Sequence, residues 1–134
     1  MELYSKNIFL LIVVSFQLSA YDQKPEAKNY YIKAKEQIEL ENYKDAKGFL
    51  RKALAIEPDY EDALSGLGKV LAETDDFASA KTCYEKLLKL KPANDEYMVS
   101  LSTAYYNLDK KAEACKALQT AVEKGIEGFL SGCK

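Results

Sequence analysis

The sequence repeats itself at an interval of 34 residues. Aligned with itself at this offset, it places Ala46, Ala80 and Ala114 in one register. Three further sets of similar residues align at the same offset: Leu50 with Tyr84 and Leu118, Ala53 with Leu87 and Ala121, and the small residues Ala34, Gly68 and Ser102. A fixed period of this length predicts an array of supersecondary units, each of which packs on its neighbours.

Each copy predicts two helices joined by a turn. In the second copy Leu64, Leu67 and Leu71 recur at three- and four-residue spacing, which is the pattern of one buried helix face. A second apolar face follows over residues 77–88, and Pro92 ends the copy because proline cannot continue a helix. The pattern therefore predicts a helix-turn-helix unit that is used three times.

Capping residues and small residues support the same division. We expect Asp59 and Asn94 to cap the first helices of the second and third copies, and residues 74–76 to cap a second helix. Two helices that pack about 8–10 Å apart need small side chains where their backbones approach. The expected contact pairs within hairpins are Ala34 with Ala46 and Gly68 with Ala80.

This pattern resembles the tetratricopeptide repeat family, whose repeat is a helix-turn-helix of about 34 residues. The second copy carries the residues typical of the family: Leu64, Leu67, Gly68, Leu71, Phe77, Ala80, Tyr84, Leu87 and Pro92. The resemblance implies an all-α fold, a right-handed α-solenoid of three helix-turn-helix hairpins, with copies at 27–60, 61–94 and 95–128. In the first copy Lys33 and Gln37 replace two of the leucines, which suits an end repeat whose outer face meets water.

The third copy ends close to the end of the sequence. Gly125 followed by Ile126 predicts a left-handed helix stop, although the earlier copies have proline at the second of these positions. Only the short tail 129–134 follows. Either Phe129 and Leu130 fold back over the last hairpin, or the thinly capped end pairs with another chain.

The first 20 residues predict a secretory signal peptide. A polar start that contains Lys6 precedes an apolar run from Ile8 to Ala20, which is too short to span a bilayer as a helix. We expect cleavage after Ala20, a short linker at 21–26 and no stable membrane anchor in the mature protein. The protein would then be exported: periplasmic in a Gram-negative bacterium, and otherwise secreted. A buried N-terminal helix and an uncleaved anchor are the alternatives.

Composition argues against several classes of function. The chain has 19 basic and 21 acidic residues, so it lacks the broad positive field that nucleic acids require. It contains no histidine, the usual general base and the commonest zinc ligand. No glycine-rich phosphate loop or paired set of carboxylates appears. We therefore expect no catalysis, no cofactor and no metal.

The resemblance implies that the first helix of each copy lines the concave side of the array. The face of these helices that turns away from the packed one supplies the candidate peptide-binding groove: Tyr31, Lys35, Lys69, Glu73, Thr103 and Tyr106. Lys35 and Lys69 are 34 residues apart and should stand side by side on adjacent helices. We expect this groove to accept an extended or helical segment with some acidic character. The alternative is that these are ordinary solvated residues.

Some members of the family hold the C-terminal carboxylate of chaperones with a clamp on these helices. The corresponding positions here include Tyr31, Lys35, Gly66, Glu96 and Ser100. Only Lys35 could hold a carboxylate, and Glu96 would repel one. This mode of binding is therefore not expected.

The three cysteines have no metal-ligand spacing. In an oxidising compartment Cys115 and Cys133 are the preferred disulfide pair, because the tail could fold back across the last helix. Three unpaired thiols are the alternative. The leading function is a non-catalytic scaffold that binds another protein or a peptide segment in envelope or secretory assembly. The alternative is a structural subunit that forms a homo-oligomer through its C-terminal end.

Overall fold

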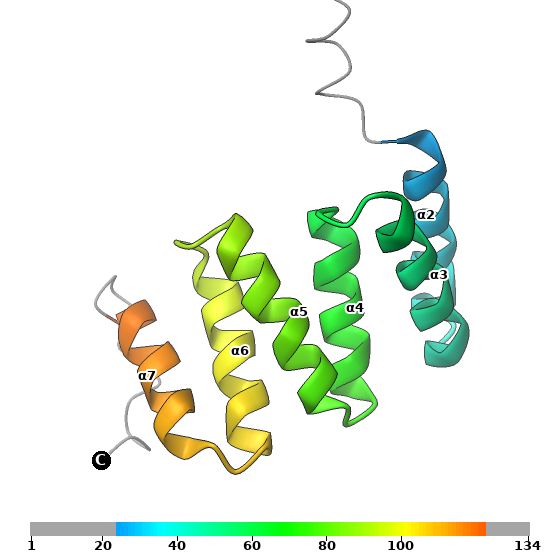
Figure 1. Ribbon diagram of the computed structural model, residues 1–134. Helices are drawn as coiled ribbons and strands as arrows, with labels where there is room; N and C mark the ends of the chain where they lie inside the picture. The colour runs from blue at the N-terminus through cyan, green and yellow to red at the C-terminus, as the bar shows by residue number, and fades with distance from the viewer. Residues whose placement is uncertain (1–23, 123–134) are drawn as a thin grey trace, which may run out of the picture.

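The computed structural model describes residues 24–122, which form six α-helices and no strand (Figure 1). The helices are α2 (Pro25–Glu39), α3 (Tyr43–Ile56), α4 (Glu61–Glu73), α5 (Phe77–Leu90), α6 (Asp95–Asn107) and α7 (Lys111–Val122). Each helix packs on the next one in sequence, and α2 also contacts α4. Three antiparallel hairpins therefore stack in a row, which confirms the predicted α-solenoid.

Some predictions concern residues outside 24–122, namely the signal peptide, the first part of the linker, the end of the third copy and the tail. Helix α2 begins at Pro25, so the last two residues of the predicted linker belong to the first helix. Proline fits there because the first turn of a helix does not use its N–H groups. Within residues 24–122 no helix has the length and apolar character needed to cross a membrane.

The turn inside each hairpin has the same backbone geometry. Glu41, Asp75 and Asp109 follow the ends of α2, α4 and α6, and they have φ angles of 56°, 57° and 58°. In each turn the next residue donates its N–H to a carbonyl five residues earlier: Asn42 to Gln37 at 2.8 Å, Asp76 to Leu71 at 2.9 Å and Lys110 to Tyr105 at 2.9 Å. This left-handed closure satisfies carbonyls that the helix leaves without partners.

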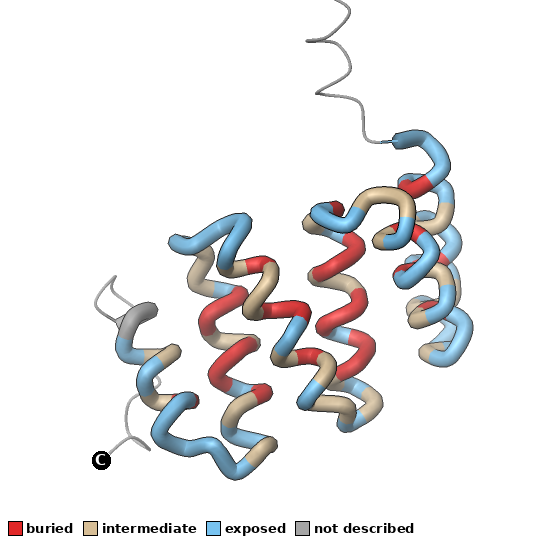
Figure 2. Tube along the Cα trace, viewed as in Figure 1, coloured by how far each residue is buried: buried red, intermediate tan, exposed pale blue. Residues whose placement is uncertain are grey.

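The core follows the predicted register. Ala46, Ala80 and Ala114 are all buried, one in each hairpin, as the register predicts. Figure 2 shows that α4, α5 and α6 carry long buried stretches. Gly68 was expected to contact Ala80, but Tyr84 lies nearer to it. The atoms nearest to the place of its missing side chain belong to the ring of Tyr84, one turn further along α5.

Two of the three predicted caps are confirmed. Asp76 accepts the N–H of Ser79 at 3.2 Å, and Asn94 accepts the N–H of Tyr97 at 3.1 Å. The prediction for Asp59 is wrong, because α4 begins one residue later than the cap required and its N-cap residue makes no side-chain cap. Asp59 instead forms a salt bridge of 3.2 Å with Lys86, which also donates to the carbonyl of Pro58.

The outer face of the first hairpin is covered by lysines over aromatic rings. Tyr30 stacks on Phe49 with ring centroids 6.3 Å apart, and the ammonium groups of Lys33 and Lys52 lie 5.9 Å and 5.6 Å from the Tyr30 centroid. In the second copy the position of Tyr30 holds the buried Leu64. Each lysine lays its apolar stem over the rings and keeps its ammonium group in water, so this face can be exposed to solvent, as expected for the first unit of an array.

Candidate binding groove

A hollow of about 450 Å³ runs across the first helices of the three hairpins. We call it the first-helix groove, and it is lined by Tyr31, Lys35, Ile38, Glu39, Asp62, Ser65, Gly66, Lys69, Glu96 and Tyr97. All ten residues come from α2, α4 and α6. The three helices form one continuous lining because each hairpin presents its first helix on the same side of the stack.

The groove brings together half of the six predicted site residues. Tyr31, Lys35 and Lys69 line it. Glu73, Thr103 and Tyr106 do not, because the lining ends at Lys69 on α4 and at Tyr97 on α6. With a rise of about 1.5 Å per residue, they stand one to two turns or more beyond its edge.

These three outlying residues are solvent-facing. Glu73 is exposed at the end of α4. The hydroxyl of Thr103 donates to the carbonyl of Val99 at 3.0 Å, which occupies its hydrogen-bonding proton. Tyr106 is 63% exposed. They extend the polar surface beside the groove rather than shape the groove itself.

The groove is crossed by one ion pair between neighbouring first helices. Lys69 of α4 lies 3.0 Å from Glu96 of α6, and both side chains are more than half exposed. Such exposed pairs add little stability, commonly less than about 1 kcal/mol. Its effect here is to neutralise the cation of Lys69, which was expected to act together with Lys35.

Tyrosines form the more enclosed part of the groove. The ring of Tyr31 packs on Tyr60 with centroids 5.4 Å apart and the ring planes tilted by 58°. Burial raises the pKa of Tyr31, and the negative charge of Asp62 raises it further, while Lys69 opposes the shift. The half-buried ring of Tyr31 therefore stays neutral at ordinary pH and presents an amphipathic surface to the hollow.

Tyr97 is a lining residue that sequence reasoning missed. Its hydroxyl donates to Glu61 Oε1 at 2.9 Å and so joins α6 to α4. Burial, followed by this hydrogen bond, raises the pKa of Tyr97 to about 12. The repeat register gave no signal for it, because the equivalent residues in the other copies are Asn29 and Ala63.

Gly66 forms part of the floor of the groove. A Cβ atom at this position would lie 3.2 Å from Leu50 Cδ2 and 3.8 Å from the Tyr31 ring. Its lack of a side chain therefore keeps the hollow open between α2 and α4. From the sequence, Gly66 is predicted only as one of the positions of a carboxylate clamp.

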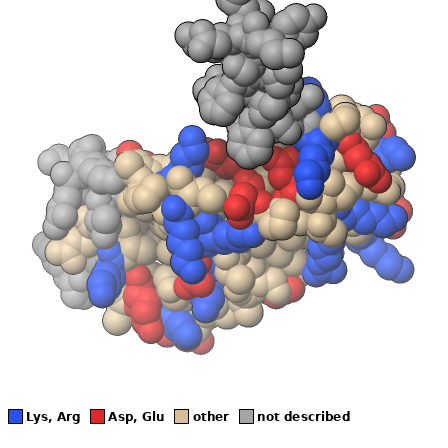
Figure 3. All heavy atoms as spheres, turned by 45° about the horizontal axis from the view of Figure 1, so that its top comes forward, with Lys and Arg blue, Asp and Glu red and all other residues tan. Residues whose placement is uncertain are grey.

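The charges that line the groove are mixed. Two lysines, Lys35 and Lys69, face three carboxylates, Glu39, Asp62 and Glu96. Acidic and basic side chains also lie side by side on the face drawn in Figure 3. The lining as a whole does not present the positive field that an acidic ligand would require.

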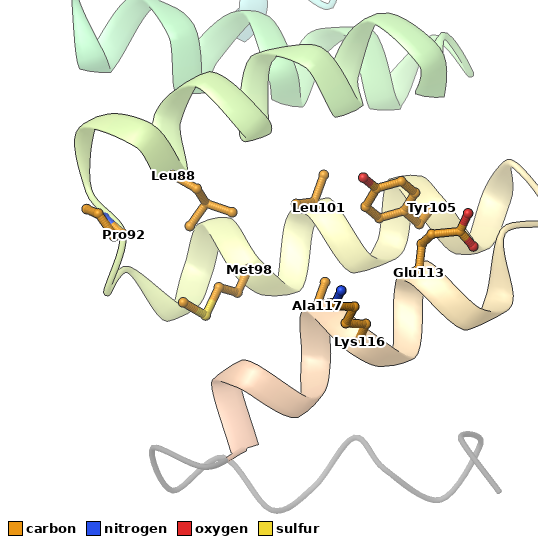
Figure 4. A pocket seen from close by; sticks show the side chains of 8 residues that line it. All are labelled: Leu88, Pro92, Met98, Leu101, Tyr105, Glu113, Lys116 and Ala117. Atoms are coloured by element: carbon orange, nitrogen blue, oxygen red, sulfur yellow. The ribbon is translucent and has the colours of Figure 1, made fainter.

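A second hollow of about 440 Å³ lies between α5, α6 and α7 (Figure 4). It is lined by Leu88, Pro92, Met98, Leu101, Tyr105, Glu113, Lys116 and Ala117. Ala117 stands in the register position of Cys83 in the second copy and Phe49 in the first.

The described cysteines do not form a reactive centre. Cys83 is a buried free thiol, and burial raises its pKa, which disfavours the thiolate. Cys115 is half-buried on α7, and Cys133 lies outside the described residues. The disulfide between them therefore stays a prediction. In the part of the chain that the structure describes, no cluster of acidic or thiol side chains is suited to hold a metal ion.

Solved structures with the same arrangement of helices include MamA proteins and a TPR domain of RPAP3. A crystal structure of MamA protein is 29% identical over 74% of this chain, with a TM-score of 0.70. MamA from Desulfovibrio magneticus RS-1 is 22% identical over 77% of it, with a TM-score of 0.71. This chain spans only 54% and 58% of those two MamA chains. The first TPR of Spaghetti (RPAP3), solved with an HSP90 peptide, is 18% identical over 81% of this chain and 85% of its own length, with a TM-score of 0.71.

The family follows from the repeats themselves. Two models described as tetratricopeptide repeat match the sequence, one over residues 37–97 and the other over residues 96–124. Together they cover well over half of the chain, and they include most of the residues that set the 34-residue register. The matched segments include five of the six helices and both junctions between hairpins. The chain belongs to the tetratricopeptide repeat family.

Proposed function

We propose that this protein is a non-catalytic scaffold that binds a polypeptide segment of another protein in the first-helix groove. The observation that carries the proposal is the hollow itself, which three helices line with half-buried tyrosine, small residues and charged rims. Concave sites with an apolar or aromatic floor and a few polar groups are the usual form of a ligand site. The fold alone would not assign this function.

Two further points support a peptide as the ligand. The RPAP3 domain, which shares the fold, was solved with the peptide SRMEEVD bound. The groove here runs across successive parallel first helices, so an extended or helical segment can contact several repeats at once. We further propose that the protein acts after export, in envelope or secretory assembly, as the predicted signal peptide suggests.

The experiment is to capture partners with the full chain from the envelope or secretory fraction of its own source. Ser65→Trp fills the groove without changing its charge, since Ser65 lines the hollow. Ala78→Trp is the matched control, because Ala78 is exposed on α5, away from the groove. Circular dichroism first checks that both variants keep the helical fold.

We expect the unchanged chain and Ala78→Trp to retain the same partner, and Ser65→Trp to lose it. Equal capture by the two tryptophan variants would contradict binding in the groove.

The second candidate function is a self-associating structural subunit. The apolar hollow between α5, α6 and α7 favours it, because Pro92 at its edge is exposed and Leu88 is only half-buried. Sedimentation velocity over a range of concentrations measures self-association directly. A concentration-dependent dimer that Ala117→Glu abolishes supports this function, and a monomer at all concentrations contradicts it.

A further inference from the structure

We propose that the segment bound in the first-helix groove carries a lysine or arginine, whose cation sits between the ring of Tyr31 and the carboxylate of Asp62. The inference rests on the proposed function and specifies the chemistry of its partner. It replaces the expectation of an acidic ligand that the two lysines suggested.

The side chains in the groove that form no salt bridge carry more negative than positive charge. Lys69 and Glu96 neutralise one another at 3.0 Å. Within residues 24–122, Lys35, Glu39 and Asp62 form no salt bridge. Two carboxylates and one ammonium group are therefore left to face a ligand, so the groove favours a cation over an anion.

Aromatic side chains line the same hollow as Asp62. Tyr31 and Tyr97 line the hollow, and the ring of Tyr60 packs against Tyr31 at 5.4 Å. Asp62 lines the same hollow as Tyr31 and Tyr97, and its negative charge contributes to the raised pKa of Tyr31. An ammonium or guanidinium group is attracted both to a tyrosine face and to a carboxylate, whereas an acidic side chain gains from neither.

The two neighbouring acids at the start of α4, Glu61 and Asp62, differ in their partners. Lys91 lies 3.8 Å from Glu61, and Tyr97 donates to the other oxygen of the same carboxylate, so Glu61 is already satisfied. Asp62 has neither kind of partner among the described residues and is exposed. Of the two neighbouring acids at the start of α4, only Asp62 is left to pair with a ligand.

The test begins with a random peptide display library selected on the full chain. We expect lysine and arginine to be enriched among peptides that Ser65→Trp no longer retains. The same selection on Asp62→Asn is expected to lose the enrichment. Glu36→Gln is the charge-matched control, because Glu36 is exposed on α2 and does not line the groove.

Binding of one selected peptide is then measured by fluorescence anisotropy. Tyr31→Phe keeps the ring and should leave the Kd unchanged, whereas Tyr31→Leu should weaken binding by about two- to fivefold, as the loss of one exposed cation–π contact does. The acidic peptide SRMEEVD, which was solved with the RPAP3 domain, contains one arginine, so the control is the same peptide with alanine in place of that arginine, and it should not compete.

The outcomes separate the two proposals. Groove-dependent peptides that are enriched in aspartate or glutamate, or that bind Asp62→Asn as well as the unchanged chain, overturn the cationic ligand and leave the scaffold function standing. A library that yields no peptide sensitive to Ser65→Trp contradicts the scaffold function and, with it, this inference.

Discussion

Replacing Gly68 by alanine should destabilise the protein although the substitution favours a helix. An alanine Cβ at this position would lie 2.9 Å from Tyr84 Cζ, 3.1 Å from Cε1 and 3.3 Å from the hydroxyl oxygen. Carbon atoms in contact prefer about 3.5–4.0 Å, so the ring or the backbone of α4 must move by several tenths of an ångström. Tyr84 is only 3% exposed and is held on all sides.

Two opposing effects decide whether Gly68→Ala raises or lowers the free energy of unfolding. Alanine gains about 1 kcal/mol over glycine inside a helix. Overpacking a close-packed core costs about 1–3 kcal/mol. We expect the second term to exceed the first, so Gly68→Ala should lower the free energy of unfolding by about 1 kcal/mol. Gly48→Ala supplies the control, because no atom lies within 4 Å of its new Cβ and the gain of about 1 kcal/mol should appear in full.

A double variant tests the mechanism. In the first hairpin Ala34 occupies the position of Gly68 and Leu50 the position of Tyr84. Gly68→Ala combined with Tyr84→Leu therefore copies a pairing that the chain already uses. Urea unfolding followed by circular dichroism should give a favourable coupling energy of about 1 kcal/mol or more for this pair. If Gly68→Ala stabilised the protein as much as Gly48→Ala does, the close contact with Tyr84 would be disproved.

Three further predictions concern the turns, the caps and alkaline pH. Because Asp109 has a φ of 58°, Asp109→Gly should raise the free energy of unfolding by about 0.5–1 kcal/mol in the same urea assay, and a loss of stability would contradict the left-handed turn. Asn94→Ala should cost about 1 kcal/mol through the lost cap, whereas Asp59→Ala should cost no more than a surface ion pair; equal losses would argue against the observed start of α4. The pKa of Tyr97 is raised to about 12, so its contribution to stability is fully present below pH 10 and is lost as pH rises toward 12. Tyr97→Phe should flatten this alkaline decline in thermal unfolding, and an unchanged pH profile would refute the assignment.

The repeat register made the fold predictable. Residues such as Ala46 and Ala80 recur because each hairpin solves the same packing problem, and local periodicity alone places both helices. The sequence could not show that the Tyr84 ring lies nearer to Gly68 than Ala80 does, because the direction of a side chain along a helix decides which residue it reaches. Asp59 was misplaced as a cap for a related reason, since a helix start can shift by one residue without disturbing the apolar pattern.

The groove was harder to predict than the fold. The exposed face of α2 and α4 followed from spacing, and so Tyr31, Lys35 and Lys69 were found. Tyr97 is not part of that face in the other copies, and only the packing of α6 on α4 brings it to the hollow. The ion pair of Lys69 with Glu96 was not predicted, because it depends on the distance between repeats, which no sequence pattern gives.

The central claim is that stacked hairpins present the first helices as one binding surface. Hydrogen exchange of the full chain, with and without a peptide selected on it, tests this most directly. We expect the peptide to slow hydrogen exchange over the lining segments of α2, α4 and α6, namely residues 31–39, 62–69 and 96–97. Protection confined to α5 and α7, or no change in the three first helices, would contradict it.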